Sequence, residues 1–400
     1  YVGNGSATGP VINLGWEPSF IILKNAEKSE NWLMWDSMRG IVTDGNDARL
    51  FPNLTTAESN IANFLNLTPT GFQINDNGGD LNEPNDSIIY IAIRRSDGYV
   101  GKPAEAGTDV FAMDGTSNGS NVFPQFTSGF PVDFSLTRNP TAGGTWDSWH
   151  TGARLLQGKY QLTATSNAWS AGGNFLYDYS DGIFIGGWTN YMSWMWKRHA
   201  GFDVVTYTGV SGTQTRAHSL GVTPEMIWVK CITGGSDPWC VGHKDLTGGW
   251  TSNHLRLNES SAEYSGNQFA IAPTSTHWST ASGGLTNNNG GKYIAMLFAS
   301  VEGISKVGSF AGSNSELTIT TGFQPRFLIV KAVSTTGQWN TLDTTRGWGA
   351  GNDPYLKLNS DQAQISGYDI GAPTATGFTL TGNMGGTNVS GVSYIYYAHA

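Results

Sequence analysis

A short apolar strand that follows a proline and ends in a basic residue recurs along the chain, and this repetition restricts the fold more than any other feature. Each copy is followed by a tryptophan. The copies occupy residues 18–24, 131–138, 224–230 and 325–331, and the tryptophans are Trp32, Trp146, Trp239 and Trp339. Because the copies lie roughly 100 residues apart, they predict tandem units of about that length.

Further features follow each strand in the same order, which strengthens the prediction of a repeat. A Gly-Phe strand occurs at residues 71–74 and again at 377–380. Each copy closes on an apolar strand that contains tyrosine, at residues 89–93, 191–196, 293–298 and 394–398. We therefore expect four units, the second of them divergent and rich in tryptophan, at residues 1–95, 108–198, 199–301 and 302–400.

The composition predicts that these units are β-structures. The chain has 53 glycines and 12% aromatic residues, but only 13% charged residues. Short aromatic and β-branched runs between turns predict an all-β fold. A unit of about 100 residues is long enough to bury its own core, so we expect four β-sandwiches. A lectin-like jelly roll is the favoured topology, and an immunoglobulin-like sandwich is the alternative.

Charge and hydropathy argue against two classes of partner. The formal net charge of −9 is spread thinly, without the basic stripe that nucleic-acid binding requires. No apolar run approaches the roughly 18–20 residues of a membrane helix, so we expect no membrane insertion. The first copy begins inside a strand and lacks a counterpart of residues 201–206. We therefore expect the chain to be a segment of a longer polypeptide.

Tryptophans outside the repeated positions are the candidates for ligand binding. The recurring tryptophans hold a fixed place beside a core strand, so we expect them to pack in the core. Loops on a rigid scaffold often carry function, and an exposed indole can stack on the apolar face of a sugar. The candidates for glycan binding lie among small polar residues and are Trp169, Trp188, Trp250 and Trp278.

An acidic loop in the first unit could bind calcium, which takes about 6–8 oxygen ligands from flexible loops. The candidate ligands are Asp76, Asp80, Glu83 and Asp86. Their spacing does not match an EF-hand, and the other units carry Asn, Thr and Gly instead. A solvated loop is therefore the alternative interpretation.

Two further pairs of residues have both structural and functional interpretations. Cys231 and Cys240 flank a segment with Gly-Gly and Pro that predicts a hairpin. They could form a disulfide across it or remain small buried residues, but two cysteines alone do not make a metal site. The segments Asp36–Arg39 and Asp343–Arg346 each predict a tight turn, in which the aspartate accepts backbone N–H groups beside the arginine. A catalytic carboxylate is the less favoured interpretation.

The combined motifs resemble a known group of proteins. The proline-led strand with its closing lysine is followed by the pattern Trp-x-x-x-Asp-x-x-Arg-Gly at 32–40 and at 339–347, then by the Gly-Phe and tyrosine-containing strands. This order resembles tandem repeats of marine bacteriophage virion proteins, mostly tail-fibre-type or uncharacterised structural proteins with lectin-like sandwich folds. The resemblance implies a virion or surface appendage that faces the host. It supplies no catalytic residues and no defined receptor.

The resulting functional hypothesis is a structural and adhesive protein of the virion surface, whose loops contact host-cell carbohydrate. As partners we expect other virion proteins and further copies of the chain, as a trimer or a larger homo-oligomer, because repetition raises weak sugar affinity. One alternative is an architectural spacer, capsid-decoration or filament protein with recognition elsewhere. A remote alternative is a polysaccharide depolymerase, since paired carboxylates can be far apart in sequence. The chain contains no familiar hydrolase or phosphate-binding motif, so we expect no enzyme activity and no cofactor beyond the calcium already considered.

Overall fold

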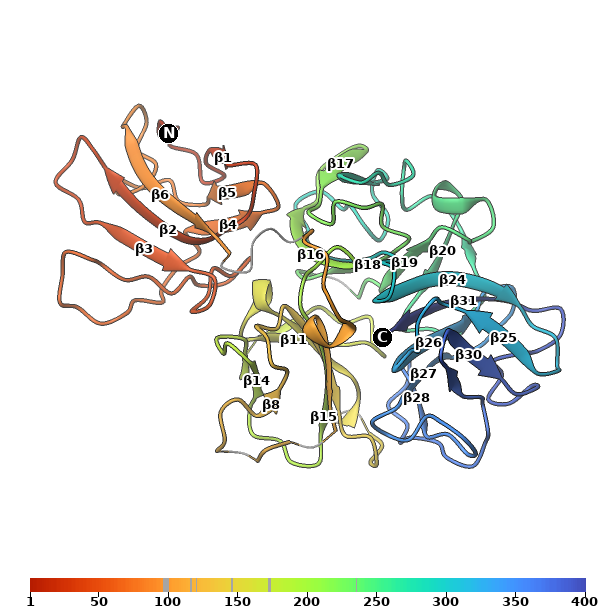
Figure 1. The fold of residues 1–400 in the computed structure, drawn as a ribbon. Helices are drawn as coiled ribbons and strands as arrows, with labels where there is room; N and C mark the ends of the chain where they lie inside the picture. Colours follow the sequence, from red (N-terminus) through yellow and green to blue (C-terminus); the bar gives the residue numbers. More distant parts are fainter. Residues whose placement is uncertain (96–100, 116, 120, 145–146, 172–173, 235) are drawn as a thin grey trace.

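The computed structural model describes residues 1–95, 101–115, 117–119, 121–144, 147–171, 174–234 and 236–400. These residues form antiparallel sheets joined by turns and a few single-turn 3-10 helices. The predicted all-β class is therefore confirmed. Among the described residues, each sheet takes its strands from only one of the segments 1–95, 108–198, 199–301 and 302–400 (Figure 1). We call these segments the first to fourth units.

The first unit is a pair of stacked sheets. Its outer sheet has the strand order β3–β2–β6, and its inner sheet has the order β1–β5–β4. The strands are β1 (Val11–Asn13), β2 (Pro18–Asn25), β3 (Leu33–Asp36), β4 (Leu65–Thr68), β5 (Gly71–Ile74) and β6 (Ile88–Arg94). Side chains alternate across a strand, and Ile21 and Leu23 of β2 are buried in one cluster with Phe72 and Ile74 of β5.

The second unit has a larger sheet in the order β12–β11–β10–β9–β15–β7 and a smaller sheet in the order β13–β14–β8. Its elements are η1 (Gly107–Asp109), β7 (Phe111–Asp114), β8 (Phe126–Thr127), β9 (Phe134–Arg138), β10 (His150–Ala153), η3 (Arg154–Leu156), β11 (Lys159–Leu162), β12 (Ser170–Ala171), β13 (Phe175–Leu176), β14 (Gly182–Ile185) and β15 (Met192–Trp196). Its own core contains Phe126, Phe175, Tyr177 and Ile183.

The third unit has the sheets β16–β23–β18–β19–β20–β21 and β17–β22. Its elements are β16 (Phe202–Thr208), β17 (Gln214–Ala217), β18 (Met226–Cys231), β19 (Cys240–His243), η4 (Gly249–Thr251), β20 (Asn253–Arg256), β21 (Tyr264–Ser265), β22 (His277–Thr280) and β23 (Lys292–Phe298). Ile227, Val229, Trp250, Phe269 and Trp278 belong to its own core.

The fourth unit has the sheets β24–β31–β26–β27–β28 and β25–β30–β29. Its strands are β24 (Ser305–Ala311), β25 (Leu317–Thr320), β26 (Phe327–Ala332), β27 (Trp339–Asp343), β28 (Tyr355–Lys357), β29 (Pro373–Thr374), β30 (Gly377–Leu380) and β31 (Ser393–His399). Leu328, Val330, Trp348, Phe378 and Tyr396 belong to its own core.

The larger sheets of the last three units share one strand order. The first strand of the unit pairs with the last strand, which pairs with the proline-led strand, which pairs with the strand that follows the tryptophan. These runs are β7–β15–β9–β10, β16–β23–β18–β19 and β24–β31–β26–β27. The outer sheet of the first unit, β6–β2–β3, has the same order among its described residues but begins at the last strand.

The register places a tryptophan beside the basic end of each proline-led strand. Lys331 and Trp339 are direct partners in the β26–β27 ladder. The other three pairs are obtained by extending the ladder of each hairpin by one residue. The pairs are Lys24–Trp32, Arg138–Trp149, Lys230–Trp239 and Lys331–Trp339. Trp149 therefore takes the place that the sequence assigned to Trp146, which lies outside the described residues.

Three of these tryptophans join different units. Each indole N–H donates to a backbone carbonyl of a neighbouring unit: Trp149 Nε1 to Lys357 O at 3.1 Å, Trp239 Nε1 to Leu162 O at 3.3 Å, and Trp339 Nε1 to Arg256 O at 3.0 Å. The second unit thus contacts the fourth, the fourth contacts the third, and the third contacts the second. The three acceptor residues occupy equivalent positions in their own units. Each of them pairs across the ladder with the residue that directly follows the tryptophan of its unit. Equivalent head-to-tail contacts close into a ring, so these units form a ring with approximate threefold symmetry.

The basic residue beside each tryptophan repeats the same pattern of contacts. Arg138 Nη2 donates to the Gln362 carbonyl at 2.8 Å, Lys230 Nζ to the Ser166 carbonyl at 2.8 Å, and Lys331 Nζ to the Ser261 carbonyl at 3.0 Å. Each bond runs to the same neighbouring unit as the indole bond beside it. Burial lowers the pKa of Lys230 and of Lys331 to about 8, because the charged ammonium group is disfavoured away from water.

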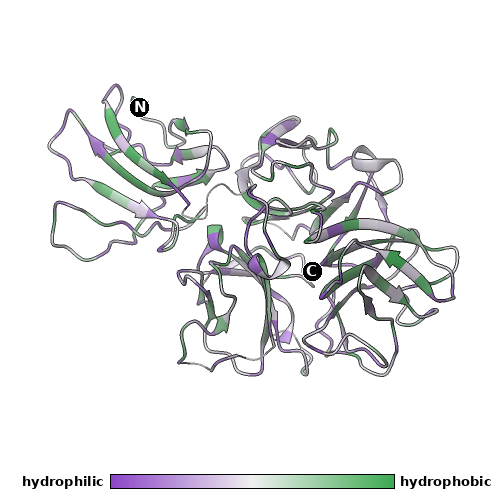
Figure 2. Cartoon of the chain, in the orientation of Figure 1, coloured by the Kyte–Doolittle hydropathy of each residue, from purple (hydrophilic) through white to green (hydrophobic). Residues whose placement is uncertain are grey.

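Aromatic side chains fill the centre of the ring. Rings from different units lie next to one another, with centroids 5.1 Å apart for Phe111–Phe327, 5.8 Å for Phe134–Phe202 and 5.0 Å for Phe298–Tyr397. The sequence predicts one core for each unit. The last three units have such cores between their sheets, and they also bury the opposite face of each larger sheet in a core that they share. Figure 2 shows hydrophobic residues along these central strands.

The first unit stands outside this ring (Figure 1). Trp239 and Trp339 are buried as predicted, and Trp339 is 1% exposed. The same prediction is wrong for Trp32, which is 36% exposed. The physical reason is that these tryptophans pack between units, not inside a single unit, and no described residue of another unit covers Trp32 in the way that Trp339 is covered.

The two cysteines follow the second of their predicted interpretations. Both are free thiols and both are buried. Cys240 pairs with Val229 in the β18–β19 hairpin, so Cys231 lies beyond it along the ladder. Burial raises the pKa of the Cys231 thiol and of the Cys240 thiol.

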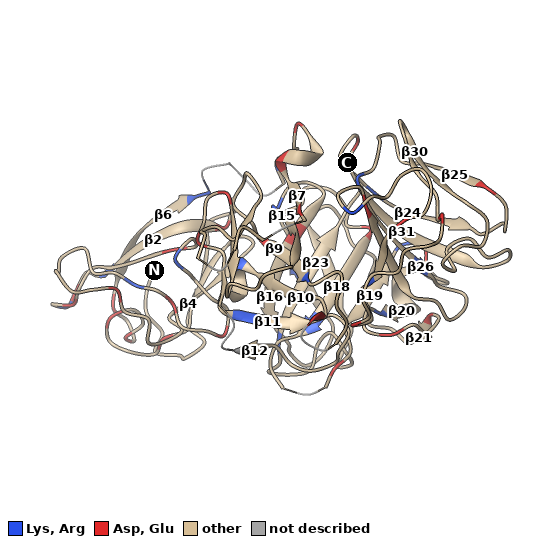
Figure 3. Cartoon of the chain, turned by 90° about the horizontal axis from the view of Figure 1, so that it is seen from below, with Lys and Arg blue, Asp and Glu red and all other residues tan. Residues whose placement is uncertain are grey.

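Charged residues of both signs are scattered along the chain (Figure 3). No helix among the described residues has the length and apolar character needed to cross a membrane.

Candidate functional site

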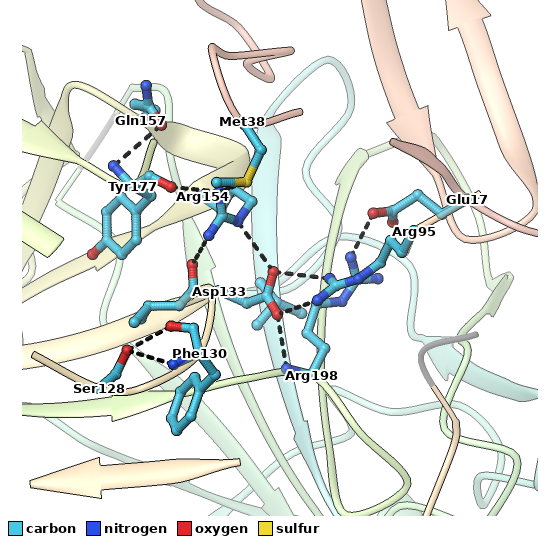
Figure 4. Close-up of polar contacts among 12 residues, drawn as sticks. Glu17, Met38, Arg95, Ser128, Phe130, Asp133, Arg154, Gln157, Tyr177 and Arg198 are labelled. Carbon is cyan, nitrogen blue, oxygen red and sulfur yellow. Dashed lines mark hydrogen bonds and ion pairs between the residues drawn. The ribbon is translucent and has the colours of Figure 1, made fainter. Parts of the chain in front are cut away.

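Six charged side chains meet where the first three units join, and we call them the junction cluster (Figure 4). They are Glu17, Arg95, Asp133, Arg154, Arg198 and Asp203. All except Arg95 are buried. Buried charges need partners of opposite sign, and here three guanidinium groups balance three carboxylates.

Asp133 lies at the centre of the junction cluster. Its carboxylate accepts hydrogen bonds from Arg95 Nη1 at 3.0 Å and Nη2 at 3.1 Å, and from the Arg198 backbone N–H at 2.8 Å. Arg154 Nε lies 3.4 Å from Asp133 Oδ1. Burial raises the pKa of a carboxyl group, but the surrounding guanidinium groups outweigh it and hold the pKa of Asp133 well below its usual range. Asp133 is therefore ionised at neutral pH.

Arg198 connects this centre to the first and third units. Its Nε donates to Asp203 Oδ1 at 2.7 Å, and its Nη1 donates to Glu17 Oε1 at 2.6 Å. Burial lowers the pKa of Arg198, but these two carboxylates outweigh it and raise this pKa well above its usual value. The second oxygen of Asp203 accepts the Ser219 N–H at 2.7 Å. Because its charged groups are paired across three units, the cluster is suited to positioning the units relative to one another.

Two cavities lie between the first and third units, and we call them together the unit 1–3 cleft. Their volumes are about 340 and 400 Å³. Pro69, Thr70 and Ala217 line both cavities, so the two are neighbours. Arg95 and Glu17 of the junction cluster also line the second cavity, which places the cleft beside the rigid joint.

The walls of the cleft carry hydroxyl, amide, guanidinium and aromatic groups. In the first cavity the Arg216 guanidinium lies 3.7 Å from the centroid of the Tyr207 ring. Thr43 Oγ1 and Thr206 Oγ1 are 2.7 Å apart and join the two units across the cavity wall. In the second cavity the wall includes the half-buried indole of Trp16. Such a mixture of apolar faces and convergent polar groups is typical of small-ligand sites.

The tryptophans that the sequence singled out lie away from solvent. Trp169, Trp250 and Trp278 are buried, and Trp188 is half-buried. Trp250 packs on Phe269, and Trp278 packs on Tyr207 behind the cleft wall. The expectation of exposed stacking rings is therefore wrong for the three buried tryptophans, because Trp250 on η4 and Trp278 on β22 belong to the core of the third unit, and Trp169 belongs to the shared core. Trp188 packs against His150, with ring centroids 4.7 Å apart.

The four acidic residues of the first unit do not assemble into a calcium site. Asp86 accepts a hydrogen bond from Asn25 at 2.7 Å and forms an ion pair with Lys28 at 3.0 Å. Asp76 accepts the Gly78 N–H at 3.0 Å, and Glu83 lies 3.7 Å from Lys28. Among the described residues, no three His, Cys, Asp or Glu side chains lie close enough together to hold a metal ion. Asp80 therefore does not form such a group with the other three. Lys28 balances Glu83 and Asp86, whereas Asp76 caps a local turn and Asp80 interacts with Glu30.

The two predicted aspartate turns have the expected geometry. Asp36 Oδ1 accepts the Arg39 N–H at 2.8 Å, and Arg39 Nε donates to Asp36 Oδ2 at 2.6 Å. Asp343 Oδ1 accepts the Arg346 N–H at 2.8 Å, and Arg346 Nε donates to Asp343 Oδ2 at 2.5 Å. The structural interpretation of these residues is confirmed.

Buried histidines make the fold sensitive to acid. Burial lowers the pKa of His150 to about 4, those of His243 and His399 to about 3, and that of His199 well below 6.5. The unfolded chain binds these protons near pH 6.5 and the folded chain does not, so stability falls as the pH drops below 6.5. Asp47 opposes this trend, because burial raises its pKa to about 7.

We expect the free energy of unfolding to fall by at least about 3 kcal/mol between pH 6.5 and 5.5, at roughly 1 kcal/mol for each of these four histidines less about the same amount for Asp47. Burial also lowers the pKa of His218 and of His254, which adds to the loss. Urea unfolding followed by circular dichroism at several pH values measures this loss. Stability that stays constant or rises over this interval would contradict the prediction.

Comparison with known proteins gives one match. A family described as a domain of unknown function, DUF7483, matches residues 1–96 and 189–400. The chain belongs to this family. No curated protein and no solved structure matches the chain.

The DUF7483 match leaves out residues 97–188, which form most of the second unit. That unit is also the one whose sequence departs most from the others. Trp239 and Trp339 lie within the match, whereas Trp149 and Arg138 lie outside it, so the ring is completed by a segment that the family description does not cover.

The sequence analysis missed the residues that line the cleft. Trp16 lies two residues before the proline of its strand, where the third and fourth units carry Val222 and Phe323. Tyr207 and Arg216 lie on β16 and β17, on the side of the third unit that meets the first. The sequence offers no signal that separates Trp16 from Phe323, which is buried in the fourth unit. Only the arrangement of the units brings it near Ala217.

Proposed function

We propose that the chain is a structural and adhesive protein of a virion or similar extracellular appendage, of the tail-fibre type, and that it contacts host-surface glycans through the unit 1–3 cleft. It consists of four copies of one lectin-like sandwich module of about 100 residues. The unit 1–3 cleft is the observation that carries this proposal, because it combines sugar-compatible groups with a rigid frame.

The common strand order supports the four-copy module. The proline-led strand lies between the last strand and the following strand in every unit. The basic residue and the tryptophan are also opposite each other in every unit. Independent folds would not be expected to keep both the order and the register, whereas copies of an ancestral module would.

The chemistry of the cleft supports a carbohydrate ligand. A sugar presents hydroxyl groups at its edge and apolar C–H groups on its face. Thr70 and Arg216 supply polar groups to the wall, while Trp16 supplies an aromatic ring. The junction cluster fixes the two sides of the cleft, which reduces the entropy that binding must overcome. A single site of this kind often binds near millimolar, about −4 kcal/mol, so several copies would be needed for firm attachment.

We predict that Trp16→Ala weakens glycan binding about tenfold, which corresponds to about 1.4 kcal/mol, because an aromatic contact face is lost. The measurement is binding of the purified chain to a glycan array and to host cells, with thermal unfolding as a check on folding. Tyr368→Ala is the matched control, since Tyr368 is an exposed aromatic residue of the fourth unit and its loss should leave binding unchanged.

A purely architectural role is the second candidate, and the burial of Trp169, Trp250 and Trp278 favours it. In that case the units act as spacers and recognition occurs elsewhere. Absence of binding to every glycan and host surface would favour this candidate, and equal binding by wild type and Trp16→Ala would remove the cleft from the proposal.

A further inference from the structure

The outer sheet of the first unit turns an apolar face to solvent. On β6, Ile89, Ile91 and Ile93 are 51%, 57% and 53% exposed. Trp32 lies on the same side at the end of the sheet, and Phe20, Ile22 and Met34 lie between them, because they occupy the matching ladder positions. We call these seven residues the outer face. Lys24 and Asp36 occupy the remaining ladder positions on this side of the sheet. A largely apolar exposed surface of this kind marks an interaction site more often than a free surface.

The residues at these ladder positions are buried in the other three units. Ile91 pairs with Ile22 in the first unit, as Tyr397 pairs with Ile329, Met296 with Trp228, and Trp194 with Leu136. All of these counterparts belong to the core that the last three units share. The outer face therefore carries the same kind of surface that elsewhere in this chain is covered by two other units.

The tryptophan and the carbonyl that accepts its hydrogen bond also have counterparts in the first unit. Trp32 occupies the position from which Trp339 donates to Arg256 O. In the other units the acceptor carbonyl belongs to the residue opposite the one that follows the tryptophan. In the first unit Leu33 follows Trp32, and because Leu50 bridges to Met34, the residue opposite Leu33 is Phe51. The Phe51 carbonyl accepts the N–H of Leu54, as the Arg256 carbonyl accepts the N–H of Glu259, so the local turn is the same. Lys24 Nζ bonds to carbonyls of its own unit, Asn25 and Lys28, where Lys331 reaches Ser261 of a neighbouring unit.

The position of the outer face leaves room for a partner. The inner sheet lies toward the third unit, with β4 in contact with β16. The outer sheet lies on the opposite side of the first unit (Figure 1). Its Ile93 end comes near the second unit, where Ile93 lines a cavity with Pro131 and Arg154. β6 is the edge strand of the outer sheet. A further strand that paired with this edge would lie in the plane of the sheet, so it would widen the outer face and would not cover it.

We propose that the outer face binds the same face of two further copies of the chain, so that three first units form a ring like that of the second, third and fourth units. Each Trp32 indole then donates to the Phe51 carbonyl of the next copy. The occupant is another copy because the ring inside this chain shows how this surface is filled: by the equivalent surface of two related units, through head-to-tail contacts that close after three steps. The interface is separate from the unit 1–3 cleft, so it does not depend on glycan binding.

The test is the mass of the full chain in solution, measured by sedimentation or light scattering over a range of concentrations. The wild type is expected to have three times the monomer mass of 42.9 kDa. Ile91→Glu is expected to be monomeric with an unchanged circular dichroism spectrum, because Ile91 is exposed within the single chain. Trp32→Ala is expected to dissociate at higher concentrations than the wild type, at least about tenfold higher, if one indole contact per interface is lost.

Ile271→Glu is the matched control, since Ile271 is 58% exposed on the third unit, outside the outer face, and this variant should remain trimeric. A monomeric or dimeric wild type would overturn the proposal, as would a trimer that persists in Ile91→Glu. Loss of the trimer in Ile271→Glu would place the interface on a different surface.

Discussion

Trp339→Ala is expected to lower the free energy of unfolding by about 3–5 kcal/mol, the range found for large buried aromatic residues. Trp339 is almost fully buried, and its indole N–H bonds to Arg256 O across the boundary between the third and fourth units. The substitution removes the packed ring and leaves a cavity between two units that cannot close without moving both sheets. Urea unfolding of the full chain, followed by circular dichroism, measures the loss.

Two further variants separate packing from hydrogen bonding at this position. Trp339→Phe keeps most of the ring volume and removes the N–H donor, so it should cost about 1–2 kcal/mol. Trp32→Ala is the matched control at the equivalent position of the first unit. Measured in the monomeric Ile91→Glu background, it should cost less than about 1 kcal/mol because Trp32 is already exposed there. Equal losses for Trp32→Ala and Trp339→Ala in this background would contradict the ring of units.

Asp133→Asn is expected to destabilise the chain by about 3–5 kcal/mol, because removal of one partner leaves buried charges uncompensated. The amide cannot balance Arg95, Arg154 and Arg198, which surround the carboxylate in the native structure. The joint between the first three units should loosen, and glycan binding by the cleft should weaken together with stability. Chemical unfolding and limited proteolysis of the connector near Arg95 measure these two effects.

Glu58→Gln provides the comparison for a carboxylate outside the core. Glu58 forms a 2.8 Å ion pair with Arg39 on the surface of the first unit. Exposed ion pairs contribute about 0–1 kcal/mol, so this variant should be close to wild type. An Asp133→Asn variant as stable as Glu58→Gln would show that the junction cluster does not hold the units together.

Local features of the structure were predicted well from the sequence. Turn-rich aromatic runs predicted the all-β class, and Asp36 and Asp343 predicted their turns, because a short carboxylate side chain can only reach N–H groups close by in the chain. The two cysteines left two alternatives, which the ladder register decides. In each of these cases the determining contacts lie within a few residues or within one hairpin.

Predictions that depended on exposure were less successful. Trp278 and Trp250 lie in segments whose composition resembles that of solvent-exposed loops, yet both rings are buried. Trp32 and Trp339 occupy equivalent places in one motif, and their environments differ. The acidic residues from Asp76 to Asp86 are close in sequence, but their side chains have separate partners. Exposure depends on what packs over a side chain from distant parts of the chain, and a local pattern carries no information about that.

The sequence by itself determined the repeated strand, its basic end and the tryptophan beside it, because these follow from alternation along a strand and from short-range register. The tertiary structure alone decided that Trp149, Trp239 and Trp339 join different units in a closed ring, and that Trp32 is left outside it. Four units with nearly the same local signal can be arranged in many ways. The arrangement was selected by side-chain packing in the shared core and by the ion pairs around Asp133, between residues more than 100 positions apart in several of the contacts.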